Sequence, residues 1–248
     1  MNNLWISAAA ADNLAPAMIA VVIDDIGYDR RRGVRAIALP GVTVAVMPFT
    51  PNADYLARLA HESGREVIIH QPMQGRRGSR HAHGTLTLGM AHNDLITTLD
   101  AAVANVPFAV GLSNHTGSVF TADRSSMDAL MRRIADHELY YLDSRTTRET
   151  VAGGAAGSWG VPFLSRDVFL DHEDHTPTIE RQFELALSIA RRRGHVVLVG
   201  HPREKSLAVL ERRLARLDPT RYELVPASEL IGLPHHTSSH SNGYASAR

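Results

Sequence analysis

Short runs of β-branched and other apolar residues recur along the chain and constrain its fold more than any other feature. Residues 18–23 are typical of a strand that is buried on both faces. Further runs of this kind occur at 42–47, 66–69, 108–112, 139–142, 168–170 and 195–199. Segments with helical periodicity lie between them at 52–62, 93–105, 123–137, 178–193 and 203–217. This alternation predicts an α/β fold with a mostly parallel sheet covered by helices, and about seven strands are enough to curl into a barrel.

The helix at 178–193 has distinct signals at both ends. Thr176 stands before Pro177, which predicts an N-cap followed by proline at the first helical position. Gly194 follows three arginines, so we expect the helix to end there with its basic side chains near the carbonyl end of the helix dipole.

Length and charge limit the classes of protein to which the chain can belong. Its 248 residues predict one domain at 17–233, with a flexible segment at 1–16 and a disordered tail at 234–248. Lys and Arg number 26, and so do Asp and Glu, so we expect no nucleic-acid partner. The longest apolar run near the start is far shorter than the roughly 20 residues that a membrane span needs, so no span is expected. Because Cys is absent, any metal must be bound by His and carboxylate side chains.

Ionisable residues stand at the end of nearly every predicted strand. They are Asp24, Asp25, His70, Asp143, Asp171 and His201, and His115 follows the fourth strand closely. The carboxyl ends of parallel strands share one face, so these residues are expected to converge there. Such a set suits a divalent metal with an open position for water, although a single Asp or His at a strand end is often only a cap or part of a hydrogen-bonded turn.

Two of these residues are adjacent in the sequence, which poses a geometric problem. Successive side chains of a strand point to opposite faces, so Asp24 and Asp25 can share a site only where the strand breaks. We expect Ile26 and Gly27 to supply that break.

Six motifs in this order resemble the divergent polysaccharide deacetylase family over residues 19–230. They are VIDDIGY at 22–28, IHQPM at 69–73, NHTGS at 114–118, LDSR at 142–145, VFLD at 168–171 and GHP at 200–202. The family is related to the NodB-like carbohydrate esterases, so the resemblance implies an irregular (β/α) barrel with seven strands. It also implies a divalent metal, Zn²⁺ being the expected ion.

The resemblance also implies roles for individual residues. Asp24 would be the general base, Asp25 and His70 metal ligands, and His201 the general acid. In the wider superfamily a second ligand histidine follows the first by four residues, but Gln74 stands there in this chain. We expect His115 to replace it.

Other residues are expected to support this site. His81 and His83 are alternative metal ligands that would need an ordered loop. Either Asp171 or Asp143 would orient His201, and both are counted among the candidate catalytic residues. Asn114, Ser144 and Arg145 are expected to bind substrate. Either Arg145 or Arg166 would replace an arginine that the superfamily places near the base.

The sequence therefore predicts a metal-dependent hydrolase that removes acetyl groups from an envelope or extracellular carbohydrate. One alternative is a weakly active or inactive barrel that binds a periplasmic glycan or a partner, and another is an unrelated metal hydrolase acting on amides or phosphates. A serine hydrolase is disfavoured because the chain has no Gly-x-Ser-x-Gly motif. The resemblance implies a periplasmic or secreted protein, although residues 1–16 do not form a complete signal peptide.

Overall fold

A computed structural model describes residues 15–76 and 81–233. The disordered tail expected at 234–248 lies outside the described residues, and so does the flexible segment expected at 1–16 apart from residues 15 and 16. The strands are β1 (Ala17–Ile26), β2 (Val42–Val46), β3 (Glu66–Met73), β4 (Ala109–Thr116), β5 (Tyr140–Asp143), β6 (Phe163–Ser165), β7 (Val168–Phe169), β8 (His195–Gly200) and β9 (Tyr222–Leu224). The α-helices are α1 (Arg30–Ile37), α2 (Ala53–Glu62), α3 (His92–Asn105), α4 (Arg124–Asp136), α5 (Ala152–Trp159), α6 (Thr176–Arg193) and α7 (Glu204–Leu214). Two 3₁₀ turns, η1 (Phe120–Ala122) and η2 (Ala227–Leu230), complete these elements.

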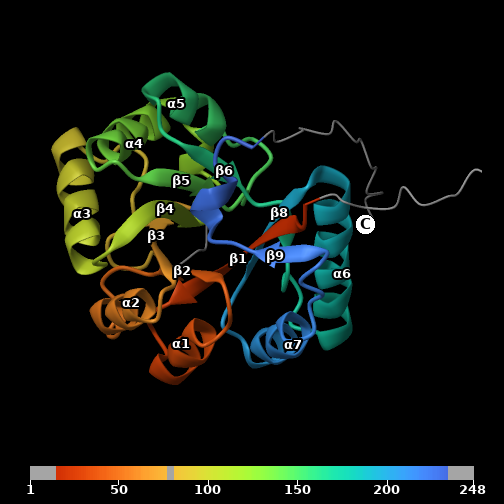
Figure 1. Cartoon of the computed structure of the whole chain (residues 1–248). Helices are drawn as coiled ribbons and strands as arrows, with labels where there is room; N and C mark the ends of the chain where they lie inside the picture. The colour runs from red at the N-terminus through yellow and green to blue at the C-terminus, as the bar shows by residue number, and fades with distance from the viewer. Residues whose placement is uncertain (1–14, 77–80, 234–248) are drawn as a thin grey trace, which may run out of the picture.

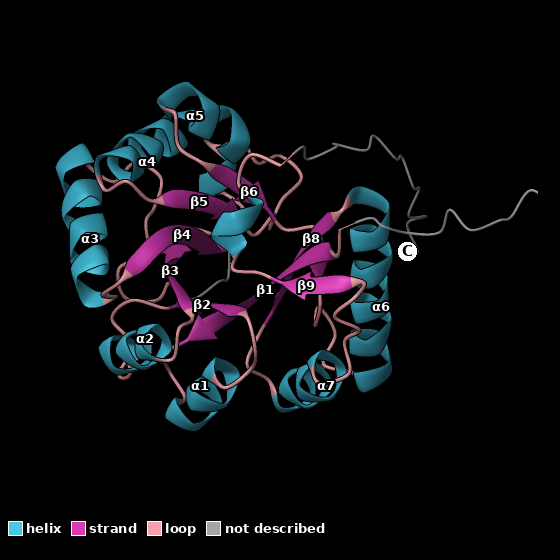
Figure 2. Cartoon of the chain, viewed as in Figure 1, coloured by secondary structure: helices cyan, strands magenta, loops and turns pink. Residues whose placement is uncertain are grey.

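The strands form one parallel sheet in the order β6-β5-β4-β3-β2-β1-β8-β7, and β9 also pairs with β1. Only Arg166 and Asp167 separate β6 from β7, and their backbone amides continue the pairing on both sides. The Arg166 amide bonds to the Asp143 carbonyl at 3.0 Å, and the Asp167 amide bonds to the Val197 carbonyl at 3.0 Å. The two ends of the sheet are thereby joined, and the helices form an outer ring around the strands (Figures 1 and 2).

The predicted parallel α/β barrel is confirmed, but the described residues contain nine strands rather than about seven. The two unpredicted strands, β6 and β9, have only three residues each and are too short to show a periodicity. Helices α1 and α5 were also not predicted. The first is rich in arginine, and the second consists almost entirely of Ala, Gly and Ser, so neither has a broad apolar stripe.

Alternating residues of the strands pack into two separate cores. In β1, Ile19 and Val21 face outward toward the helices, whereas Ala20 and Val22 face the barrel interior. The inner core also contains Val225, Ala227 and Leu230, so η2 covers the end of the barrel where the strands begin. Polar residues lie at the opposite end of the barrel, where the strands finish.

Two strand ends and one helix cap differ from the prediction. Strands β3 and β4 stay paired as far as Met73 and Thr116, so His70 and His115 lie inside strands rather than after them. Helix α6 already includes Thr176, and His175 is its N-cap, whereas Gly194 ends the helix in a left-handed conformation as predicted. In the described part of the chain, no helix is long and apolar enough to cross a membrane.

Candidate active site

A bulge in β1 allows Asp24 and Asp25 to face the same site. Ile23 pairs with Val44 and Ile26 with Val46, so β1 has one more residue than β2 over this stretch. Asp25 has a φ of 57°, in the left-handed region that is uncommon for residues other than glycine. The predicted break therefore exists, but it lies at Asp24 and Asp25 rather than at Ile26 and Gly27.

The Asp25 carboxylate is the centre of a cluster with two histidines. Its Oδ1 atom lies 2.8 Å from His115 Nδ1 and 3.3 Å from His70 Nε2. One ligand atom from each of the three residues can be chosen so that all lie within 4.8 Å of one another. Burial opposes ionisation of Asp25, but hydrogen bonds from His115 and His70 hold the pKa of its carboxyl well below the usual range. These residues could therefore bind a divalent cation through one oxygen and two nitrogens.

Ser113 fixes the orientation of the His70 ring. The two residues are opposite each other in the β3–β4 pairing, and His70 Nδ1 lies 2.7 Å from Ser113 Oγ. With Nδ1 as the donor to this hydroxyl, loss of the Nε2 proton would replace the hydrogen bond to Asp25 with a lone pair that can bind a metal ion. Metal-binding histidines commonly have such a partner on the second ring nitrogen.

Asp24 is buried beside this cluster, and one of its oxygens has no hydrogen-bond partner in the described part of the chain. Its side chain is 4% exposed, and Oδ1 lies 3.6 Å from His70 Nδ1, beyond hydrogen-bonding distance. Burial raises the pKa of the Asp24 carboxyl, against the opposing effect of the charges of His70 and His201. A carboxylate with a raised pKa and an unpartnered oxygen is well suited to accept a proton.

His201, directly after β8, is held by Asp171 and faces the cluster with its other nitrogen. Its Nδ1 lies 2.8 Å from Asp171 Oδ1, and its Nε2 lies 3.7 Å from Asp25 Oδ2. Asp171 is fully buried and also accepts hydrogen bonds from the His201 amide at 2.9 Å and from Ser206 Oγ at 2.6 Å. Burial lowers the pKa of the His201 ring, but the hydrogen bond and charge of Asp171 outweigh this effect and raise it.

Asp143 does not contact His201 and instead holds the loop that follows β5. Its carboxylate accepts hydrogen bonds from the Arg145 amide at 2.7 Å and from Thr150 Oγ1 at 2.9 Å. Of the two carboxylates expected to orient His201, the structure thus places Asp171 against the ring.

The three residues expected to bind substrate line the same cavity, but they differ in what they can offer. Asn114 already uses its side chain within the protein, because Oδ1 accepts from the Ser144 amide at 2.9 Å and Nδ2 donates to the Thr116 carbonyl at 2.6 Å. The Ser144 hydroxyl is buried and has no hydrogen-bond partner among the described residues. Arg145 is exposed at the rim.

The residue at the superfamily's second histidine position has a structural contact. Gln74 Oε1 accepts a hydrogen bond from the Leu88 amide at 2.7 Å, which ties the loop after β3 in place. His83 packs edge-on against Phe49, with ring centroids 4.9 Å apart, and lines with His81 a cavity separate from that of His70. Among the described residues, the cluster of possible ligands includes His115 and neither of these loop histidines.

The site opens into a cavity of about 410 Å³ at the carboxyl ends of the strands. Asp24, His70, His115 and His201 line it, and Phe169 packs beside His201 with ring centroids 5.5 Å apart. These ionisable residues come from separate strands and converge as predicted on one face of the barrel.

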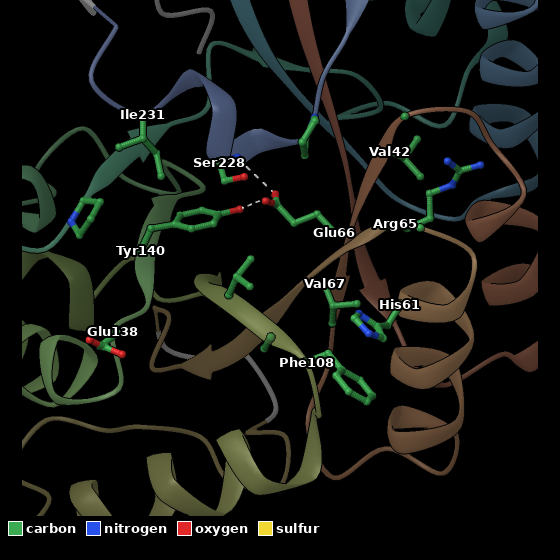
Figure 3. Close-up of a pocket in the computed structure, with 16 residues that line it drawn as sticks. Val42, His61, Arg65, Glu66, Val67, Phe108, Glu138, Tyr140, Ser228 and Ile231 are labelled. Atoms are coloured by element: carbon green, nitrogen blue, oxygen red, sulfur yellow. Dashed lines mark hydrogen bonds between the residues drawn. The ribbon is translucent and has the colours of Figure 1, made fainter.

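A larger cavity of about 790 Å³ lies at the opposite end, beside the first residues of β2 to β5 (Figure 3). Its walls are mainly apolar. At its inner end, Glu66 Oε1 accepts hydrogen bonds from Tyr140 Oη at 2.9 Å and from the Ser228 amide at 3.3 Å. These bonds hold η2 against the barrel, and in the described residues the cluster of possible metal ligands is at the other end.

Comparison with known proteins identifies the family. Residues 21–231 match the divergent polysaccharide deacetylase family. The chain belongs to this family. The uncharacterized protein YibQ of Escherichia coli K12 is 38% identical over 217 residues, which are 87% of this chain and 68% of YibQ.

Two solved structures are similar to this divergent polysaccharide deacetylase family member. An uncharacterized protein of Agrobacterium tumefaciens C58 has a TM-score of 0.83 and 25% identity, over 88% of this chain and 91% of that one. The catalytic domain of peptidoglycan N-acetylglucosamine deacetylase from Eubacterium rectale has a TM-score of 0.51 and 16% identity, over 92% of this chain and 97% of that one. The latter similarity supports the deacetylase-type barrel fold.

Sequence reasoning did not assign two residues that position the histidines of this family member. Ser113 follows no local signal, because its contact with His70 depends on the β3–β4 register. Ser206 lies in α7 and reaches Asp171 across 35 residues of sequence. Its position on the inner face of the helix after the GHP motif is the one sequence signal that could have indicated this role.

Proposed function

We propose that the chain is a metal-dependent deacetylase that removes acetyl groups from an envelope or extracellular carbohydrate. The observation that supports this most is that Asp24 and three histidines line one cavity, with the Asp25 carboxylate close to all three histidines. If these residues only formed buried ion pairs, nothing would require Asp24, His70 and His201 to line the same cavity. We further propose that the protein acts in the periplasm or outside the cell, where such carbohydrates occur.

The residues at the centre of the cluster fit a divalent metal. Asp25, His70 and His115 offer the oxygen and nitrogen atoms that Zn²⁺ prefers, and Ser113 gives the second ring nitrogen of His70 a hydrogen-bond partner. Three protein ligands leave a coordination position for water or substrate. When bound, such an ion supplies Lewis acidity toward water and toward an acetyl carbonyl.

The remaining residues supply proton transfer. Asp24 accepts a proton as water attacks the acetyl carbon, and its buried position keeps bulk water from competing for that oxygen. His201 donates a proton from Nε2 to the departing amine or alcohol. At the same time the bond between the acetyl carbon and the leaving nitrogen or oxygen breaks. Asp171 keeps Nδ1 protonated and stabilises the charged ring. Acetate and a free amine or hydroxyl group are the products.

Acetate release from chitohexaose, an N-acetylated oligosaccharide, tests this proposal with the Zn²⁺-loaded full chain. Asp24→Asn is expected to reduce the rate by about 10²–10⁴-fold, the usual contribution of a general base. Asp54→Asn is the control, since Asp54 is an exposed residue of α2 paired with Arg58. An unchanged rate in Asp24→Asn would show that Asp24 is not the base. A wild-type protein that binds glycans and Zn²⁺ but releases no acetate from any acetylated carbohydrate would instead support a non-catalytic binding protein.

A further inference from the structure

A second cavity of about 640 Å³ adjoins the proposed active site. It shares Arg145, Thr146, Arg166 and Phe169 with the cavity that His201 lines. Beyond these shared residues it extends along the loop after β5 and reaches α6 at Gln182 and Leu185. The two cavities are therefore adjacent, and we call the second one the arginine groove.

The arginine groove has more positive charge than the composition of the chain would suggest. The chain as a whole is neutral, yet Arg145, Arg148 and Arg166 all line this cavity. Its one carboxylate, Asp167, is already engaged by Arg193 at 3.1 Å and by the Val197 amide at 2.9 Å. The charge that remains available in the groove is positive.

In the described part of the chain, no acidic side chain neutralises the two exposed arginines of the groove, Arg145 and Arg148. Arg145 and Arg148 are exposed, and within the described residues no carboxylate oxygen lies within 4.0 Å of either guanidinium. Other exposed arginines, such as Arg132 and Arg191, likewise have no carboxylate oxygen within 4.0 Å in the described part of the chain, so Arg145 and Arg148 are distinguished by their place beside the proposed active site. Unpaired guanidinium groups beside a substrate cavity are suited to bind an anion, for which the planar fork of donors is shaped.

Hydrogen bonds fix several of the residues that line the arginine groove. Arg166 donates to the Ser144 carbonyl at 2.8 Å and lies over the Phe169 ring at 4.8 Å from its centroid. Thr146 Oγ1 donates to the Thr116 carbonyl at 2.9 Å, which fixes the loop against β4. Together with the bonds of Asp143 to this loop, they fix the Arg166 side chain and the backbone that carries Arg145 and Arg148 beside the proposed active site.

We propose that the arginine groove binds a carboxylate-bearing sugar unit next to the acetylated one, so that the substrate is an acidic, acetylated glycan. This inference rests on the proposed deacetylase function and adds the substrate class. A neutral polymer would leave Arg145 and Arg148 without a partner, whereas the carboxylate of a uronic acid would meet both their charge and their hydrogen-bond geometry.

Binding of two matched oligosaccharides tests the proposal without depending on turnover. Hyaluronan hexasaccharide and chitohexaose both contain N-acetylglucosamine, but only the first contains carboxylates. We would measure their affinities by calorimetry for the Zn²⁺-loaded full-length Asp24→Asn protein at low and high salt. Hyaluronan is expected to bind about tenfold tighter at low salt, and the difference should shrink as salt screens the charges.

A variant pair locates the effect. Arg148→Gln should reduce the ratio of the two affinities by roughly twofold to fivefold, the range measured for exposed ion pairs. Arg191→Gln, which changes an exposed arginine of α6 outside the groove, should leave the ratio unchanged. Equal affinities for the two sugars, no binding of either, or equal effects of both variants would overturn the proposal.

The same reagents separate this inference from the proposed function. Acetate release from chitohexaose with equal affinities would refute the arginine groove and leave the deacetylase proposal intact. A carboxylate preference that depends on Arg148, in a wild-type protein that releases no acetate, would support the groove and refute the deacetylase.

Discussion

The pair formed by Asp171 and His201 gives the most quantitative prediction. Asp171 is fully buried and accepts hydrogen bonds from the His201 ring, the His201 amide and Ser206 Oγ. Substitution by Asn preserves the size of the side chain but removes its negative charge. The amide group must also turn its NH₂ toward one of the existing donors, which breaks at least one of these bonds.

The size of the effect follows from the lost charge. A hydrogen bond to a charged group contributes about 1.5–3 kcal/mol, and about 1.4 kcal/mol corresponds to one pKa unit. Asp171→Asn should therefore lower the pKa of His201 by about 1–2 units. As the proposed acid, His201 must be protonated, so activity is lost as the pH rises through its pKa. The alkaline limb of the pH profile should accordingly move to lower pH by about 1–2 units.

Nuclear magnetic resonance titration of the His201 ring in the Zn²⁺-loaded protein measures this shift directly, and the pH profile of acetate release measures its consequence. Asp100→Asn is a matched control, because Asp100 Oδ1 lies 2.8 Å from His137 Nε2 on the surface, the same distance as in the buried pair. An unchanged His201 pKa in Asp171→Asn would refute the role assigned to Asp171. A shift of the His201 pKa in Asp100→Asn as large as the shift in Asp171→Asn would refute it as well.

Three further predictions concern the support of the site and of the barrel. Ser113→Ala should weaken Zn²⁺ binding by about 10–100-fold in a competition titration, because His70 loses the partner of its second nitrogen, and an unchanged affinity would contradict that role. Glu66→Leu should lower the free energy of unfolding in urea by about 1–3 kcal/mol, since Tyr140 Oη and the Ser228 amide lose their acceptor, and a stability equal to wild type would refute it. Gly27→Ala should destabilise the chain by at least about 1–3 kcal/mol, because φ is +138° and the added Cβ would lie 2.0 Å from Thr50 Oγ1, and a normal melting temperature would contradict this.

The sequence was a good guide to the fold because burial leaves a local pattern. Strands buried on both faces appear as continuous apolar runs, and each long run was found. The shortest strands, β6 and β9, have too few residues to show such a pattern. The extent of β3 and β4 was underestimated because polar residues, such as Gln71 and Asn114, follow their apolar runs and ordinarily end a buried strand.

The site was predicted in outline because its residues follow apolar runs in a recognisable order. Their exact geometry was not predictable from local sequence. The bulge at Asp24 and Asp25 depends on pairing with β2, and the contact of Ser113 with His70 depends on register between two strands. Asp143 and Asp171 stand in similar sequence positions, and only the three-dimensional structure distinguishes the loop anchor from the partner of His201.

The central claim is that Asp25, His70 and His115 bind a metal ion. Anomalous diffraction at the zinc edge from crystals of the Zn²⁺-loaded full chain tests it most directly. One strong peak between the Asp25 carboxylate, His70 Nε2 and the His115 ring, lost in crystals of His115→Ala and retained in those of His83→Ala, is the expected result. A peak at another position, or none at these three residues, would contradict the account.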